Sequence, residues 1–130
     1  MNGVEIRDKD PRGFLSFDLE QILECLGDAA LRRVWRCTHL ECSGEGADAL
    51  ELASEAIDPV DGERLLQLAR SVLQVIDGEF AGYLPGQLHV SLRISAIDSS
   101  LWEVFGDDVT LNRIRAAFKD VRPIDPDERR

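Results

Sequence analysis

The sequence has little of what several protein classes require. No apolar run approaches the ~18 residues of a membrane-spanning helix, and residues 1–12 (MNGVEIRDKDPR) lack the charged-then-apolar pattern of a secretory signal. Basic residues are also scarce, since 15 Lys and Arg stand against 25 Asp and Glu, a net charge of −10. We therefore expect no membrane insertion and no direct binding to nucleic acid, whose phosphates require a clustered basic surface.

Cysteine is rare as well. Three cysteines, an odd number, predict free thiols in a reducing compartment, and we place the protein in the cytoplasm. A chain of 130 residues can bury a core without disulfides or metal. We expect a single domain over residues 1–130, with loose termini at 1–12 and 123–130.

Local patterns predict an α+β fold of two layers. Three strands in succession form an antiparallel meander, and an earlier strand joins them after a helical crossover, giving a four-stranded, mainly antiparallel sheet with helices on one face. In the strand Leu88–Ile97, Val90 alternates with His89 and Arg93, so the outer side of the sheet is polar. The order αβαβββα comprises helix Phe17–Leu26 capped by Ser16, strand Val34–Cys42, helix Pro59–Ile76 capped by Asp58, strands Glu79–Leu84, Leu88–Ile97 and Leu101–Phe105, and a last helix after Asp108.

The negative charge is concentrated in one segment. Residues 41–63 contain eight acids and no base, so this segment alone accounts for −8 of the −10. Within it, residues 47–56 form either a short surface helix or a mobile acidic stretch. Clustered charge of one sign steers oppositely charged partners. We expect contacts with a basic protein at Glu45, Asp48, Glu51 and Glu55, where no core role competes for the side chain.

Two constellations suggest chemistry. Cys37, His39 and Cys42 could ligate zinc, but a closed set of four ligands is not visible, and buried thiols are the commoner explanation. His89 and Ser91 share a strand face near Asp98, but no motif forces a nucleophile geometry. We expect no metal, no cofactor and no catalytic residues.

The outer face of the sheet is the second candidate contact surface. Tyr83, His89 and Arg93 are placed there, and tyrosine and arginine are enriched in binding hot spots. In the strand Leu101–Phe105, either Trp102 and Val104 or Leu101 and Phe105 face inward. The same outer face is a candidate for association between two copies of the chain.

Three functions follow from these patterns. The first is a non-enzymatic interaction module of the inhibitor, immunity or adaptor type that binds a basic protein. The second is a small-ligand binder or minor enzyme with a pocket between helices and sheet. The third is a nucleic-acid mimic that occupies the basic groove of another protein. We favour the first because no ordered catalytic set is visible.

Overall fold

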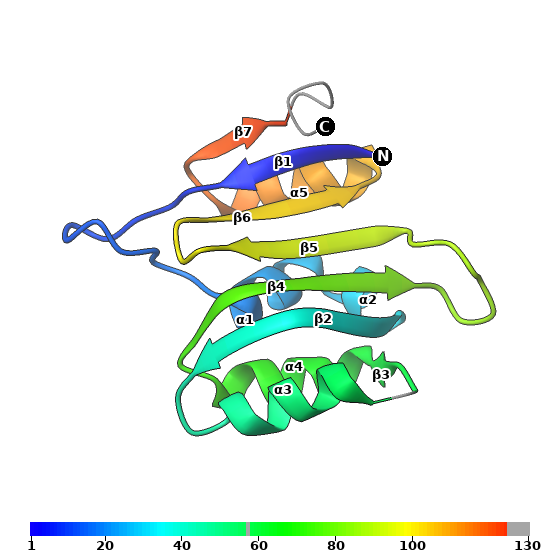
Figure 1. The fold of residues 1–130 in the computed structure, drawn as a ribbon. Helices are drawn as coiled ribbons and strands as arrows, with labels where there is room; N and C mark the ends of the chain where they lie inside the picture. The colour runs from blue at the N-terminus through cyan, green and yellow to red at the C-terminus, as the bar shows by residue number, and fades with distance from the viewer. Residues whose placement is uncertain (57, 125–130) are drawn as a thin grey trace.

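The computed structural model describes residues 1–56 and 58–124, which form an α+β fold (Figure 1). Within these residues a seven-stranded open sheet, antiparallel throughout, has the order β3-β2-β4-β5-β6-β1-β7 and is accompanied by five helices. The expected class is therefore confirmed, whereas the expected four-stranded sheet and the order αβαβββα are wrong. The strands are β1 (Asn2–Ile6), β2 (Val34–Ser43), β3 (Val60–Asp61), β4 (Gln74–Tyr83), β5 (Leu92–Ile97), β6 (Leu101–Gly106) and β7 (Val121–Pro123); the helices are α1 (Leu19–Leu26), α2 (Asp28–Leu31), α3 (Ala47–Glu55), α4 (Gly62–Ser71) and α5 (Asp108–Ala117).

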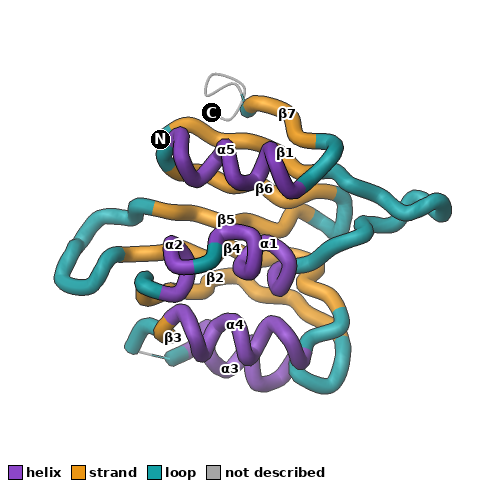
Figure 2. Tube along the Cα trace, turned by 180° about the vertical axis from the view of Figure 1, so that it is seen from behind, coloured by secondary structure: helices purple, strands orange, loops and turns teal. Residues whose placement is uncertain are grey.

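The two sides of the sheet differ. Figure 2 shows α1, α2, α4 and α5 on one side of the strands, while Figure 1 shows β4, β5, β6 and β1 with no described helix in front of them. Helix α3 lies beside β2 at the edge of the sheet and also contacts α4. We call the uncovered side the open face, because it is the side on which another molecule can meet the central strands directly.

The meander is confirmed with shifted boundaries. β4, β5 and β6 pair in sequence, and Leu92 and Ile94 point into the core. In β6 the inward pair is Trp102 and Val104, both fully buried. Residues 88–91 are a loop rather than the first part of the strand, so the predicted strand Leu88–Ile97 is too long at its start.

The beginning of the chain is the largest correction. We expected residues 1–12 to be loose, but β1 pairs with β6 on one side and with β7 on the other. Val4 and Ile6 are fully buried against the β6 register partners Val104 and Trp102. The expected loose end 123–130 is also wrong at its start, since residue 123 belongs to β7; residues 125–130 lie outside the described residues.

The predicted helix Pro59–Ile76 is wrong at both ends. β3 pairs with the start of β2, so the helix starts only after Asp61, whose Oδ1 accepts a hydrogen bond from the backbone N–H of Arg64 at 2.8 Å. At the other end the backbone becomes extended at Val72, and β4 begins two residues later. Leu73, which lies inside the predicted helix, is therefore in the extended connection and is 78% exposed.

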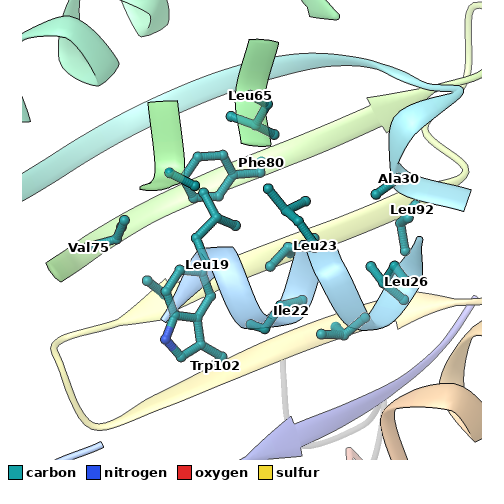
Figure 3. Packing of buried hydrophobic residues seen from close by; sticks show 14 of the residues in the cluster. Leu19, Ile22, Leu23, Leu26, Ala30, Leu65, Val75, Phe80, Leu92 and Trp102 are labelled. Atoms are coloured by element: carbon teal, nitrogen blue, oxygen red, sulfur yellow. The ribbon is translucent and has the colours of Figure 1, made fainter. Parts of the chain in front are cut away.

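One core lies between the sheet and the helices. Figure 3 shows α1 against the sheet, with Leu19, Ile22, Leu23 and Leu26 packed among Phe80, Leu92 and Trp102. All four residues lie within the predicted helix Phe17–Leu26, but the helix begins two residues later than expected and its N-cap is Asp18, not Ser16. Each such aliphatic side chain contributes about 1.5–3 kcal/mol on burial.

A bulge in β2 brings Cys37 and Cys42 to the same side of the strand. In a regular strand, residues an odd number of positions apart, such as Cys37 and Cys42, lie on opposite faces. The register shifts between residues 38 and 42, where His39 has φ 55°, and such bulges change which side of the strand the next residues face. Cys37, which precedes the bulge, is in the core. Cys42, which follows the bulge, packs against the same core.

Candidate functional site

Helix α3 carries most of the predicted acidic contacts. Residues 47–55 are helical, which decides between the two alternatives that the sequence left open. Ala47 and Leu50 are buried, so the opposite side of the helix faces solvent. Asp48 and Glu55 are exposed on α3, and Glu45 is exposed in the turn that precedes it.

Glu51 has a structural role that the sequence did not reveal. Its Oε1 accepts a hydrogen bond from the backbone N–H of Cys42 at 3.1 Å. This bond satisfies a backbone donor of β2, a strand that β3 covers only at Val34 and Trp35, and unpaired edge donors invite pairing with other chains. We therefore leave Glu51 out of the candidate surface.

Leu52 is the apolar member of the same helix surface. It is 65% exposed and lies four residues after Asp48 and three before Glu55, spacings that place both carboxylates beside it. An exposed apolar side chain with charges around it matches the arrangement of an interface, in which an apolar centre is surrounded by a polar rim. We define the α3 surface as Glu45, Asp48, Leu52 and Glu55.

The structure separates His89 from the other two residues that were predicted on the outer face of the sheet. Tyr83 and Arg93 come from β4 and β5, whereas His89 is exposed in the loop between these strands. Tyr83 lines a shallow pocket with Arg36 and Leu88 at the end of the sheet. Arg93 forms an ion pair with Glu79 in which Nε and Oε1 are 2.9 Å apart. Tyr83 lies two residues after Ala81, the register partner of Arg93, and therefore shares the face of the sheet with Arg93, so only His89 leaves the predicted set.

A hollow on the open face contains residues that the sequence analysis missed. Arg93 is part of it, with Glu79, Ser95 and Glu103 from β4, β5 and β6; it is also lined by Met1, Gly3, Phe105 and Ile124. The period-two alternation of the strands would have placed the β5 and β6 members on one face. The contribution of residues 1–3 could not be anticipated without knowing that β1 pairs with β6.

The groups considered for nucleophilic catalysis do not converge. The Oγ of Ser91 accepts from Arg33 Nε at 3.0 Å and donates to the carbonyl of Gly82 at 3.4 Å. Asp98 follows the far end of β5, roughly 20 Å from Ser91 at the usual rise of a strand. His89 contributes no described hydrogen bond to either residue. The arrangement gives no activated serine.

The thiols are equally unsuited to nucleophilic chemistry. Burial raises the pKa of Cys37 to about 12, and burial together with the nearby carboxylate of Glu51 raises the pKa of Cys42 to about 12. Burial also raises the pKa of Cys25. A reactive cysteine requires the opposite shift. Among the described residues no group of three His, Cys, Asp or Glu side chains is placed to hold a metal ion.

Comparisons with known proteins add no family. No family model matches the chain, and neither the curated proteins nor the solved structures give a significant match. Within the described residues no helix is long and apolar enough to cross a membrane. The functional argument therefore rests on the geometry of the molecule.

Proposed function

We propose that this protein is a non-enzymatic interaction module that binds a basic protein partner through the α3 surface. The observation that carries the proposal is Leu52, 65% exposed between the solvated carboxylates of Asp48 and Glu55. The carboxylates would speed encounter with a basic partner, and Leu52 would supply apolar contact in the docked complex. Inhibitors, immunity proteins and adaptors act in this way.

The position of α3 supports this reading. The helix lies at the edge of the sheet, outside the layer formed by α1, α2 and α5 (Figure 1), and its buried residues are limited to Ala47 and Leu50. A partner can therefore reach it without any rearrangement of the core. The serine and thiol environments described above disfavour the enzyme alternative.

The test compares two charge variants of equal size. One carries Glu45→Gln, Asp48→Asn and Glu55→Gln; the control carries Asp28→Asn, Asp98→Asn and Asp108→Asn, which removes three exposed charges outside α3. Each immobilised protein is exposed to a lysate of its source organism, and retained proteins are identified by mass spectrometry. We expect one basic protein to be retained by the wild type and the control and lost from the α3 variant.

The purified partner then gives the kinetics. Its association rate should fall at least about tenfold between 50 and 500 mM salt, because solvent-exposed charges are screened. Leu52→Ala should instead raise the dissociation rate, since it removes contact area rather than charge. Equal retention by all three proteins would contradict the proposal. Competition between the partner's nucleic acid and this protein would identify the mimic alternative.

A further inference from the structure

A second hollow, of about 700 Å³, lies where β1 ends and β7 begins. Figure 1 shows these strands side by side, with the segment after β1 leaving the sheet at the end where β7 starts. Ile6 is the register partner of Val121 there, and the backbone N–H of Arg7 donates to the carbonyl of Asp120 at 2.9 Å. The β1–β7 hollow, as we call it, is lined mainly by charged side chains, and four of them are basic: Arg7, Lys9, Lys119 and Arg122.

Two carboxylates in the lining are occupied in holding the local structure together. Asp8 accepts hydrogen bonds from the backbone N–H groups of Lys119 at 2.9 Å and of Asp120 at 2.6 Å. Asp10 forms an ion pair with Arg12 at 3.2 Å, and its Oδ1 accepts from two backbone N–H groups of the same turn. Both carboxylates therefore fix the loop and the start of β7.

The two arginines are each held by a carboxylate two residues earlier on their own strand. Nε and Nη2 of Arg7 both lie 2.9 Å from Oε2 of Glu5. Nε and Nη2 of Arg122 donate to the two oxygens of Asp120 at 3.0 and 3.3 Å. Within the described residues Nη1 of neither guanidinium forms a hydrogen bond, so each planar fork is oriented while one nitrogen keeps its two donors.

The charges of the hollow leave a positive excess. Lys9 and Lys119 are exposed, and neither ammonium forms an ion pair in the described part of the chain. We count the lining together with every side chain that is paired to it, which adds Glu5 and Arg12. Five basic groups then stand against four acidic ones, a net charge of +1. The excess thus remains after each ion pair has been included.

The β1–β7 hollow is also far from the acidic segment. In the order of the sheet β7 is separated from β2, beside which α3 lies, by five strand spacings, or roughly 24 Å. This distance is about three Debye lengths at physiological ionic strength. An anion at the hollow is therefore screened from the carboxylates of α3, and the local positive charge determines what it attracts.

We propose that the β1–β7 hollow binds a phosphate group, either free phosphate or the phosphate of a small ester. The ammonium groups of Lys9 and Lys119 would contact the phosphate oxygens as mobile point charges. Nη1 of Arg7 and of Arg122, together with the hydroxyl of Ser16 in the lining, would donate to the remaining oxygens. A phosphate fits better than a carboxylate, because it carries more charge and more acceptor oxygens for several donors. This inference does not depend on the α3 surface.

The probes are inorganic phosphate and glycerol 3-phosphate, and sodium chloride at equal ionic strength is the control. Each is titrated into ¹⁵N-labelled protein at about pH 7.5, where phosphate is mostly a dianion. We expect saturable amide shifts at Lys9, Ser16 and Lys119 with both phosphates, in the millimolar range, and none with chloride. Tighter binding of the ester would assign the site to a phosphate ester, and equal affinity would assign it to the phosphate group alone; either result supports the proposal.

Variants of matched charge test the cause. Lys9→Gln with Lys119→Gln removes the two unpaired ammonium groups, whereas Arg32→Gln with Arg64→Gln removes two exposed positive charges outside the hollow. We expect phosphate to bind roughly tenfold more weakly to the first double variant and equally well to the second. Asp10→Asn keeps an oxygen that accepts from the turn and removes a negative charge, so it should strengthen binding about threefold.

Three results would overturn the inference. They are an unaltered affinity in the double lysine variant, an equal loss in the arginine control, and shifts of the same size with chloride. Weaker binding in Asp10→Asn would also contradict the charge argument. None of these substitutions lies on α3, so the proposal for that surface stands or fails separately.

Discussion

The carboxyl group of Asp18 makes the stability of this protein depend on pH in an unusual direction. Asp18 is the N-cap residue of α1, and both of its carboxylate oxygens lie 3.2 Å from the backbone nitrogen of Val75, the donor at the start of β4. Burial raises the pKa of Asp18 from 3.8 to about 6, despite the hydrogen bonds from Val75 and Leu19 that oppose the shift. The folded protein therefore holds a proton at Asp18 at pH values where the unfolded chain has released it.

The sign follows from proton linkage. Between pH 4 and 6 the folded state binds more protons than the unfolded state at this site, so the free energy of unfolding falls as the pH rises. The difference between a pKa of 3.8 and one of about 6 corresponds to about 3 kcal/mol. This contribution is present below pH 4 and is lost as the pH rises through 6.

Asp18→Asn removes the titration and keeps an amide oxygen that can accept from Val75. Between pH 4 and pH 7 the wild type should lose up to about 3 kcal/mol of unfolding free energy that the variant does not lose. The difference, variant minus wild type, should therefore rise by that amount. Urea unfolding at unit intervals of pH measures both proteins. A difference that stays constant within about 0.5 kcal/mol over this range, or that moves the other way, would refute the reasoning.

Asp107→Asn is the matched control of opposite sign. Asp107 caps α5 by accepting from the backbone N–H of Thr110 at 2.8 Å, and this bond lowers the pKa of Asp107. A lowered pKa contributes stability above pH 4 that is lost on further acidification. Asp107→Asn should thus be less stable than the wild type at pH 7, and the gap should close below pH 4.

Three further predictions test the packing. Gly62→Ala should lower the free energy of unfolding by about 1–3 kcal/mol, although alanine favours helices. The added Cβ would clash with a backbone oxygen of α2. A variant as stable as the wild type in urea would contradict this. Trp35→Phe should lower the free energy of unfolding by about 1 kcal/mol more than Trp102→Phe does. The reason is that Trp35 Nε1 donates to a carbonyl of α2 at 3.0 Å, whereas the buried Nε1 of Trp102 has no partner among the described residues. Equal losses of stability in the two variants would contradict this prediction. Cys25 should react first with a thiol reagent and Cys37, 3% exposed, only on unfolding, as peptide mapping by mass spectrometry would show; early labelling of Cys37 would refute the buried-thiol account.

Local patterns were sufficient for much of the fold. The helix Phe17–Leu26 and the meander of three strands were predicted from neighbouring residues, and they are present as α1 and as β4, β5 and β6. These features depend on side-chain periodicity and turn chemistry, which act over a few residues. The acidic character of residues 41–63 is likewise a property of the sequence itself.

The candidate sites were predictable only in part. Asp48 and Glu55 are exposed on α3, as expected, but the hydrogen bond from Cys42 to Glu51 joins two elements and has no local signature. His89 was assigned to a strand because alternation continues through residues 88–91, although the chain there forms a loop. The residues that line the hollow around Ser95 come from strands that are distant in sequence.

Only the tertiary structure decided how the ends of the chain are used. β1 and β7 are short and carry weak signals of their own, yet they extend the sheet because β1 finds β6 about a hundred residues away and then offers its other edge to β7. β3 limits α4 in the same way, since pairing with β2 holds residues 60–61 extended where the sequence alone favours helix. The physical reason is that backbone hydrogen bonds and shared burial across the sheet outweigh the small propensity differences within a segment, and those partners are known only once the chain has folded.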